Sequence, residues 1–368
     1  MAASPIAGNK LDPFLRDGSV GRFDEKDLAE PTQMVKDAPF KILAGLSNAA
    51  LAEKVCKQLG VPMMLMSLGR HKDGEIDIQL GESVRNSHIY VLQSTCPPVN
   101  DNLMELFLII RCLRRASAKS ITAVMPYFGY ARQDRKTQAR VPISASDVAI
   151  MIEKAGADRV LAVDLHCGQI QGFFHNAPVD NLSALRDMAP FVVNTILPSL
   201  GEEAPLCIVS PDAGGVARAK EFLNALTTLG ISNITLAITV KHRAGPGEIE
   251  GMNVVGEIDG KHCIIIDDMI DTAGTLCKSA ETLKEMGART VSACATHGLF
   301  NGPALQRIGD SCMSYCIVSD TIPVKGARPE KIKVVSSAPL IADAIQCINS
   351  GQSLSGLFKI MQRVASVV

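Results

Sequence analysis

Three carboxylates and a run of small residues within positions 264–275 could bind a sugar phosphate. Asp267 and Asp268 follow three isoleucines, and Asp271 opens a turn that continues through Gly274. Backbone N–H groups at a helix start bind phosphate, while adjacent carboxylates bind vicinal hydroxyls or a hydrated magnesium ion. We therefore interpret the segment as a ribose phosphate site. A helix cap is the alternative, but three acids after an apolar strand exceed what a cap needs.

Three further groups of polar residues follow predicted strands. Residues 130–136 contain three cations and a glutamine, which fit an anion-binding loop but also a solvated basic loop. Asp164 and His166 are two positions apart, so on an extended chain they face the same way and could hold a metal ion or phosphate; a structural histidine is the alternative. Asp212 opens a glycine-rich turn and could bind magnesium or ribose hydroxyls, or serve the turn alone.

A cationic loop follows another predicted strand. Lys241 and Arg243 precede Gly245, Pro246 and Gly247, a sequence that favours a mobile loop. Phosphoryl or pyrophosphoryl transfer requires that charge be neutralised and water excluded, which such a loop can achieve. An exposed hairpin is the alternative. The sequence has no Walker A motif, so a nucleotide would have to bind in another way.

Short apolar strands and helical patterns must position these groups, and they alternate along the chain. This alternation predicts parallel sheets covered by helices on both faces, with the proline-rich residues 177–205 separating two α/β domains. The predicted strands are residues 40–44, 88–93, 121–125, 160–163, 206–209, 234–239, 262–266, 291–295 and 315–318. The predicted helices are residues 49–59, 102–116, 146–155, 216–226 and 276–286.

The composition of the 368-residue chain argues against several classes of protein. A net charge of −1 and an aromatic content of 4% disfavour a nucleic-acid-binding surface. No apolar run is long enough to span a membrane, so we expect no membrane partner. The 11 cysteines are scattered in apolar segments, as is typical of core positions in a reducing compartment. The N-terminal extension (residues 1–39) lacks a signal core, and its many acids disfavour a mitochondrial transit peptide. Because it is rich in Gly, Pro and Asp without clear periodicity, we expect it to wrap the surface or to be partly disordered.

Several motifs occur together in the order that is typical of one enzyme family, and they span about residues 40–358. The motifs are residues 81–85 (Gly-Glu-Ser-Val-Arg), 100–106, 130–134 (Tyr-Ala-Arg-Gln-Asp), 142–145, 164–166, 169–174, 209–215, 267–275 and 296–298 (Thr-His-Gly). On these residues the chain resembles the ribose-phosphate pyrophosphokinases, also called phosphoribosyl pyrophosphate synthetases.

This resemblance implies an α/β protein with two phosphoribosyltransferase-like (Rossmann-like) domains, whose parallel sheets are flanked by helices. The implied parts are an N-terminal extension (1–39), an ATP-side domain (40–182, joined by the C-terminal segment 345–368) and a ribose 5-phosphate-side domain (183–344). The resemblance also implies a cytoplasmic homo-oligomer that is built from dimers and reaches a hexamer.

The implied reaction transfers the diphosphoryl group of ATP, with Mg²⁺ as cofactor, to the 1-hydroxyl of ribose 5-phosphate. The implied catalytic residues are His166, Lys241 and Arg243. The implied ATP-binding residues are His71, Asp73, Glu75, Arg132, Gln133, Asp134 and His166. The implied ribose 5-phosphate-binding residues are Asp212, Asp267, Asp268, Asp271, Thr272, Ala273, Gly274 and Thr275. The implied metal-binding residues are Asp164, His166, Asp180 and Asp212.

Two departures from the family pattern concern ATP binding and regulation. His71 stands where the family usually has a phenylalanine that stacks on adenine, so we expect weaker, pH-sensitive stacking. Residues 137–139 are less polar than in members that phosphate activates and ADP inhibits. Phosphate and ADP are nevertheless the effectors that the resemblance implies. The implied allosteric residues are Ser83, Arg85, Arg140, Ser353 and Ser355.

Two other functions share parts of this pattern. A non-catalytic, regulatory relative would assemble with active subunits, although the presence of His166, Lys241 and Arg243 argues against it. Release of AMP by the purified chain alone would distinguish the two. A purine or pyrimidine phosphoribosyltransferase has the ribose-phosphate turn, but it needs only one such domain and no loop like that of Arg132 and Gln133. Base-dependent release of pyrophosphate would support that function.

Overall fold

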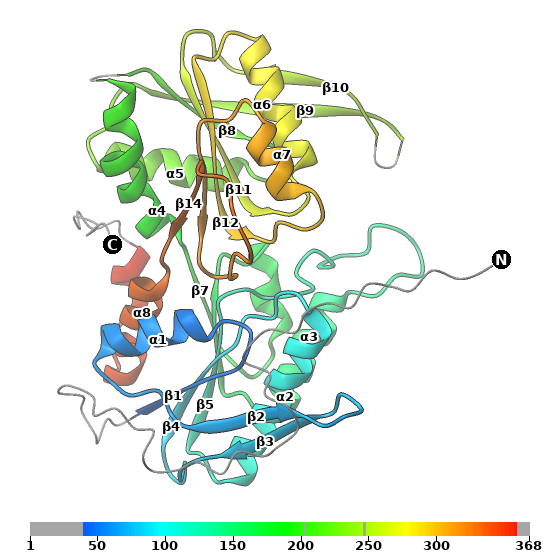
Figure 1. Cartoon of the computed structure of the whole chain (residues 1–368), viewed down its shortest axis with the longest axis vertical. Coiled ribbons are helices and arrows are strands. Elements are labelled where there is room, and N and C mark those ends of the chain that lie inside the picture. The colour runs from blue at the N-terminus through cyan, green and yellow to red at the C-terminus, as the bar shows by residue number, and fades with distance from the viewer. Residues whose placement is uncertain (1–39, 202–203, 246–247, 359–368) are drawn as a thin grey trace.

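The structure is a computed structural model that describes residues 40–201, 204–245 and 248–358. It consists of two α/β halves stacked along the longest axis, each with its own sheet (Figure 1). Parallel strands flanked by helices form both halves, which confirms the predicted fold class. Within the described ranges, none of the helices combines the length and the apolar character needed to cross a membrane.

The first half is built on a parallel sheet with the strand order β1-β4-β5-β6-β7. Its strands are Phe40–Ala44 (β1), His88–Leu92 (β4), Ser120–Met125 (β5), Arg159–Val163 (β6) and Val179–Leu182 (β7). Its helices are Ala49–Leu59 (α1), Val99–Arg115 (α2), Ser144–Ala155 (α3) and the 3₁₀ helix Gly168–Phe173. A separate antiparallel hairpin pairs Met66–Arg70 (β2) with Ile76–Leu80 (β3).

The second half has the strand order β10-β9-β8-β11-β12-β13-β14, and its strands are parallel except that β10 runs antiparallel to β9. Its strands are Leu206–Ser210 (β8), Ile234–Gly245 (β9), Glu248–Val255 (β10), His262–Ile270 (β11), Thr290–Gly298 (β12), Cys316–Ser319 (β13) and Ile332–Val335 (β14). Its helices are Val216–Thr228 (α5), Gly274–Glu285 (α6) and Ala304–Asp310 (α7).

The connection between the sheets is helical but irregular. Leu185–Phe191 (α4) leads into a π-helical turn at Val192–Ile196 and a 3₁₀ turn at Leu197–Leu200. Pro190 and Pro198 lie in this stretch, and because proline lacks an N–H donor it prevents a regular α-helix from continuing.

The last long helix, Ala338–Ser350 (α8), returns to the first half and packs against α1 (Figure 1). Leu51 of α1 and Ile341 of α8 belong to one buried cluster, which also includes Phe222 of α5. The apolar core is therefore continuous between the two halves on this side of the molecule.

Differences between the predicted and observed elements have local causes. β11 runs on to Ile270 because its pairing with β12 continues past the two acids that the sequence places at its end. Residues 177–205 do not only separate the sheets, since β7 within them is an edge strand of the first sheet. The sequence pattern also misses the β2–β3 hairpin, in which exposed polar residues alternate with half-buried ones along β3.

Candidate functional site

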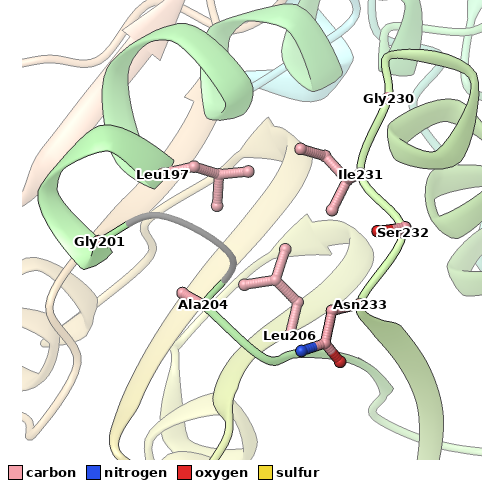
Figure 2. Close-up of a pocket in the computed structure, with 8 residues that line it drawn as sticks. All are labelled: Leu197, Gly201, Ala204, Leu206, Gly230, Ile231, Ser232 and Asn233. Carbon is pink, nitrogen blue, oxygen red and sulfur yellow. The ribbon is translucent and has the colours of Figure 1, made fainter.

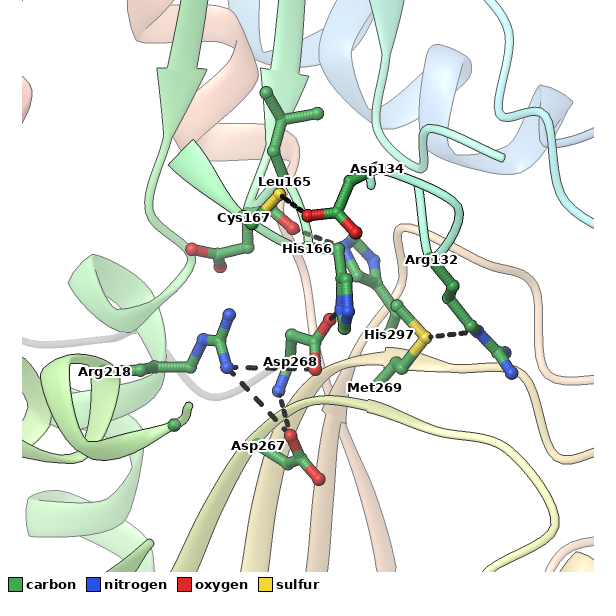
Figure 3. Close-up of polar contacts among 12 residues, drawn as sticks. Arg132, Asp134, Leu165, His166, Cys167, Arg218, Asp267, Asp268, Met269 and His297 are labelled. Carbon is green, nitrogen blue, oxygen red and sulfur yellow. Dashed lines mark hydrogen bonds and ion pairs between the residues drawn. The ribbon is translucent and has the colours of Figure 1, made fainter. Parts of the chain in front are cut away.

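The candidate site lies where the two halves face each other. His166 follows β6 of the first half, and Asp268 lies in β11 of the second half. His166 Nδ1 is 2.6 Å from Asp268 Oδ2, so a hydrogen bond joins the halves (Figure 3). Both side chains come from the carboxyl-end regions of parallel strands, where α/β proteins place their ligands.

Arg218, in the first turn of α5, completes a cluster with the acid pair. Its Nη1 lies 3.8 Å from Asp268 Oδ1 and 4.0 Å from Asp267 Oδ1 (Figure 3). The backbone N–H of Asp268 donates to Asp267 Oδ1 at 2.9 Å. The side chain of Asp268 is 6% exposed and that of Asp267 is 36% exposed. Asp268 is therefore enclosed by its partners, whereas Asp267 is only partly buried.

These surroundings give the adjacent acids different pKa values. Burial acts to raise the pKa of Asp268, but the hydrogen bond from His166 and the charge of Arg218 outweigh it and lower that pKa. Burial, followed by the charge of Asp268, raises the pKa of Asp267 to about 7. The hydrogen bond to Asp268 raises the pKa of His166. The cluster therefore favours an imidazolium beside an ionised carboxylate.

The predicted phosphate turn has the geometry of a helix start. Ala273 has a φ of 59°, and α6 begins at Gly274 with Thr275 in its first turn. N–H groups in a first helical turn lack intrahelical partners, so they can bind an anion. Arg307 Nη1 donates to Thr272 O at 3.0 Å, which places a cation against the turn. Donors and a cation together fit a phosphate group.

The carboxylate of Asp271 is engaged by other protein groups. Its Oδ2 accepts from Arg132 Nη1 at 2.5 Å, and its Oδ1 accepts from Asn301 Nδ2 at 2.8 Å. Burial acts to raise the pKa of Asp271, but these two partners outweigh it and lower that pKa. Arg132 Nε also contacts Met269 Sδ at 3.0 Å (Figure 3). The predicted ATP loop and the predicted phosphate turn are thus joined directly.

The rest of the loop after β5 is tied to the segment after β6. Gln133 Oε1 accepts a hydrogen bond from Ser144 Oγ at the start of α3. Asp134 Oδ2 accepts from Gln169 Nε2 at 2.7 Å and from Cys167 Sγ at 2.9 Å. Two predicted ATP-binding residues are therefore held in place by the first half itself.

Asp164 and Asp212 both stabilise the turns that carry them. Asp164 Oδ2 accepts from Thr296 Oγ1 at 2.6 Å and from the N–H of Ala184 at 2.9 Å. Asp212 Oδ1 accepts from the N–H of Gly215 at 3.0 Å, just before α5. Each acid follows a parallel strand, as the sequence predicts, and each fixes a loop at that edge of its sheet.

The structure does not bring Asp180 to the other predicted metal ligands. Its Oδ2 accepts from Arg159 Nη1 at 2.5 Å, in an ion pair between β7 and β6. Asp180 pairs with Leu161 inside the sheet, whereas Asp164 and His166 follow the end of β6. Asp180 was therefore predicted wrongly to lie beside Asp164 and His166, because its carboxylate binds the guanidinium of Arg159 and its backbone lies within β7.

The predicted adenine-binding residues form the tip of the β2–β3 hairpin. The N–H of His71 donates to Glu75 O at 2.8 Å, and the N–H of Glu75 donates to Asp73 Oδ1 at 3.1 Å. All three residues are exposed. The hairpin lies at the outer end of the first half rather than at the junction (Figure 1), so one chain alone does not bring these residues to His166.

The predicted allosteric residues lie on three separate segments, and all are exposed. The N–H of Arg85 lies 3.4 Å from Ser83 Oγ, and Ser353 Oγ lies 3.0 Å from Ser355 Oγ. Arg140 has a φ of 63° in the loop before α3. These hydrogen bonds connect residues within a segment, so they do not assemble the five residues into one site.

Lys241 and Arg243 lie in β9, in a stretch whose side chains are outside the described residues. Their backbones pair with Met252 and Ile249 of β10. The paired strands extend beyond the rest of the second sheet (Figure 1). The catalytic role of the two cations therefore stays a prediction.

Two pockets of the described chain lie away from the junction. The pocket in Figure 2, of about 230 Å³, is lined by Leu197 and Leu206 and by the turn between α5 and β9. Another, of about 290 Å³, is lined by residues of β4, β5 and β6 together with Asn349 at the end of α8. None of the predicted site residues lines either pocket, so neither changes the location of the candidate site.

The donor set fits magnesium that is bound together with a nucleotide. Over the part of the chain that is described, no group of three or more His, Cys, Asp or Glu side chains is placed to hold a metal ion. Mg²⁺ usually keeps several waters and uses one or two carboxylates plus substrate phosphates, so it needs no preformed cluster. Asp164 and His166, two positions apart after β6, fit that mode of binding.

Four residues that contact the candidate site were not predicted from the sequence: Arg218, Cys167, Thr296 and His297. Arg218 follows the glycine-rich turn before α5, and a cation at a helix start was a usable signal. Thr296 and His297 come at the end of an apolar strand, as the predicted acids do. Cys167 had no signal beyond its position next to His166.

In comparisons with known proteins, both halves match domains of the same enzyme family. Residues 40–156 match the N-terminal domain of ribose phosphate pyrophosphokinase, and residues 213–359 match the phosphoribosyl synthetase-associated domain. A ribose-phosphate pyrophosphokinase from Helicobacter hepaticus is 46% identical over 319 residues, which cover 87% of this chain and 99% of that protein. One from Agrobacterium fabrum is 48% identical over 321 residues, which cover 87% of this chain and 100% of that protein.

The fold comparison gives the same result. The crystal structure of phosphoribosylpyrophosphate synthetase from Mycobacterium smegmatis matches with a TM-score of 0.78 and 38% sequence identity. The match covers 85% of this chain and 99% of that chain, so it includes both sheets and the junction between them.

Proposed function

The chain belongs to the ribose-phosphate pyrophosphokinase family, and from this premise we propose how its own residues perform the reaction. The enzyme transfers the diphosphoryl group of ATP to the 1-hydroxyl of ribose 5-phosphate, yielding 5-phosphoribosyl 1-pyrophosphate and AMP for nucleotide biosynthesis. The observation that carries the residue assignment is the contact of His166 with Asp268 across the junction. This contact supports the proposal that Asp267 and Asp268 bind the sugar opposite the loop that binds ATP.

Ribose 5-phosphate binds to the second half in this proposal. The N–H groups and hydroxyls of Thr272 and Thr275, with the backbone of Ala273 and Gly274, hold the 5-phosphate at the start of α6. Asp271 supports the turn through its carboxylate rather than touching the phosphate, because Arg132 and Asn301 occupy that carboxylate. Asp267 and Asp268 accept hydrogen bonds from the ribose hydroxyls, with Asp212 alongside.

ATP binds to the first half. Arg132, Gln133 and Asp134 contact the nucleotide from the loop after β5, which α3 and the segment after β6 hold in place. His71, Asp73 and Glu75 contact the adenine of an ATP molecule that is bound in a neighbouring subunit, because within one chain the hairpin lies away from the junction. This assignment requires a homo-oligomer, and we propose one that is built from dimers and reaches a hexamer in the cytoplasm.

Asp164 and His166 of the first half and Asp212 of the second half are the residues of this chain that would hold Mg²⁺, together with the phosphates of ATP and without a preformed three-residue cluster among the described residues. When bound, the ion supplies neutralisation of the phosphate charge. The 1-hydroxyl oxygen of the sugar attacks the β-phosphorus in line. As this bond forms, the bond between the β-phosphorus and the α–β bridging oxygen breaks, AMP leaves with that oxygen, and the hydroxyl proton passes to water. The cations Lys241 and Arg243 stabilise the charge on the transferring group, and Asp268 holds the ring of His166 in place beside it, so catalysis is mostly positioning and electrostatics.

One assay tests the reaction: AMP formed by the purified chain from ATP, magnesium and ribose 5-phosphate, with and without phosphate or ADP. We expect AMP to form at a rate that depends on both substrates. Absence of AMP from the chain alone would favour the regulatory subunit, and base-dependent pyrophosphate release would favour a phosphoribosyltransferase. The response to phosphate and ADP tests the allosteric assignment separately.

The cationic strand offers a sharper test. We expect Lys241→Ala or Arg243→Ala to lower kcat by about 100-fold or more while the Kd of ribose 5-phosphate changes little, because the lost charge acts in the transition state. Lys278→Ala removes the same charge from an exposed position on α6 and is the matched control. Equal losses of binding and turnover in the strand variants would contradict the role.

A further inference from the structure

The end of β12 directs two adjacent side chains at one residue of the other half. Thr296 Oγ1 donates to Asp164 Oδ2 at 2.6 Å, and His297 Nε2 lies 3.1 Å from Asp164 O. Neighbouring side chains on a regular strand point to opposite faces, but the pairing of β12 with β13 shifts register between Ala295 and His297. Such an irregularity re-aims side chains and is common next to active sites.

Asp164 needs these partners because its backbone is in an unfavourable conformation. Its φ is 42°, in the left-handed region that residues other than glycine rarely adopt. Its N–H donates to Leu182 O at 2.8 Å, and its Oδ2 also accepts from the N–H of Ala184. Contacts from β12 and from the segment after β7 therefore hold the turn in this shape.

The ring of His297 is fixed in one orientation. The residue is 2% exposed, its Nδ1 lies 2.9 Å from Thr321 Oγ1, and its ring packs edge-on against Tyr127 at 5.0 Å. Because Asp164 O can only accept, Nε2 carries a proton and donates it to this carbonyl.

The turn held in this way leads directly to the catalytic histidine. Asp164 is separated from His166 only by Leu165, which is buried and whose N–H donates to Asn181 Oδ1 at 2.9 Å. His166 Nδ1 then meets Asp268 Oδ2 (Figure 3). A displaced Asp164 would therefore move the imidazole relative to the acid pair.

We infer that Thr296 and His297 are positioning residues, which hold Asp164 and thereby aim His166 at Asp268. Neither residue needs to touch a substrate. The inference rests on the proposed function, because it assigns a consequence for turnover to the orientation of His166. Its geometric part, that the two residues set the His166–Asp268 contact, is independent of what His166 does chemically.

Four variants test the inference. His297→Phe keeps the ring volume but removes both hydrogen bonds, Thr296→Val is isosteric and removes only the hydroxyl, and His297→Gln keeps an amide donor near the position of Nε2. We expect kcat to fall by about 10- to 100-fold in the first two with KM values within about threefold, and most of kcat to return in the third. His262→Gln is the matched control, because His262 is also buried and bonded to a threonine, at the other end of β11.

Crystal structures of the same variants supply a readout that does not depend on activity. We expect the His166–Asp268 hydrogen bond to be lost or lengthened in His297→Phe and Thr296→Val and to be retained in His297→Gln and His262→Gln. An intact bond in both of the first two, together with kcat within about twofold of the parent, would overturn the inference. If His297→Phe does not fold, Thr296→Val decides the question. His166→Ala separates the two proposals. If it keeps full activity, and the His166–Asp268 bond is lost in His297→Phe and Thr296→Val, the proposed role of His166 fails but the positioning role of Thr296 and His297 stands.

Discussion

At the scale of single residues, two neighbouring and chemically identical acids have opposite properties. Asp268 faces His166 and Arg218 and stays ionised, whereas Asp267 lacks the histidine partner and has a pKa near neutrality. The difference depends on side chains that come from the segment after β6 and from α5, far away in the sequence. In the proposed sugar site, a hydroxyl would therefore meet a permanently ionised acceptor at Asp268 and a titratable group at Asp267.

This difference predicts how stability depends on pH. The pKa of Asp267 is raised from 3.8 to about 7, so the folded state binds its proton more tightly than the unfolded state does. Stability is therefore lost as the pH rises from about 4 to about 7. Asp267→Asn cannot ionise and is expected to gain about 1 kcal/mol relative to the parent across that range, after allowance for solvent screening. Urea denaturation at several pH values measures the gain.

Asp268→Asn provides the comparison of opposite sign. The pKa of Asp268 is lowered, so its carboxylate contributes stability that is present at neutral pH and is lost on acidification. We expect this variant to be destabilised at pH 7 and to approach the parent in acid. If the stabilities of both variants and of the parent depended on pH in the same way, the two acids would share one environment and the prediction would be contradicted.

Residue types indicated the candidate site more readily than they indicated which residues would be partners. The acids of β11 and the histidine after β6 could be recognised because polar side chains at the ends of apolar strands are informative. That Arg132 would bind Asp271, or that Asp180 would bind Arg159, could not be predicted, because each pair depends on how the strands and loops are placed in space.

At the scale of elements, the loop after β1 depends on a glycine that faces a buried polar network. Leu46 N–H and Gln93 Nε2 donate to Glu105 Oε1 at 2.7 and 2.9 Å. Gln93 and Glu105 are almost fully buried, and burial raises the pKa of Glu105. A Cβ at Gly45 would lie 2.3 Å from Gln93 Oε1 and 2.6 Å from Glu105 Oε1. The network leaves no room for a side chain there.

We therefore expect Gly45→Ala to destabilise the protein by about 2–3 kcal/mol, because the methyl group must displace buried, hydrogen-bonded oxygens. Gly60→Ala is the control: Gly60 ends α1 with a φ of 66°, and a Cβ there would meet nothing within 4 Å. Its cost should be only about 1 kcal/mol of backbone strain. Chemical denaturation measures the free energy of unfolding of both variants. Equal losses would mean that Gln93 and Glu105 can move to make room for the methyl group.

Apolar runs predicted the central strands well, because strands buried on both faces need nearly continuous apolar sequence. The observed β1, β4, β5, β6, β8 and β11–β13 all overlap predicted strands. The limits of β11 were less accessible, because Asp267 and Asp268 look like a strand end although their backbones remain in the sheet. The short strands β7 and β14 carry too little pattern to be recognised alone.

At the scale of the whole molecule, α8 is the element that ties the end of the chain to its beginning. Leu340, Ile341 and Ile345 are buried, and they belong to the cluster that includes residues of α1. Removing side chains of this kind from water contributes roughly 1.5–3 kcal/mol each, so together they approach the stability of a whole domain.

Truncation tests this dependence. A chain that ends at residue 337 lacks α8 and is expected to be insoluble, or to bind a hydrophobic dye, because the apolar face of α1 is uncovered. A chain that ends at residue 350 keeps α8 and is the matched control. A soluble, cooperatively unfolding protein without α8 would show that the first half is stable by itself.

The overall arrangement was the least predictable level. Strand and helix alternation indicates two α/β halves, but it contains no information about which surfaces meet. That the carboxyl-end regions of β6 and β11 face each other depends on contacts such as that of Asn48 Nδ2 with Asp320 O at 2.7 Å, between residues far apart in sequence.

The return of α8 to α1 also constrains how the protein is made. Ribosomes deliver the chain from its N-terminus, so all strands of the first sheet emerge long before the helix that covers α1. The apolar face of α1 stays uncovered in the nascent polypeptide for as long as translation of the second half takes. Chaperones that protect emerging chains should therefore bind to this face, and release it only when the last helix arrives.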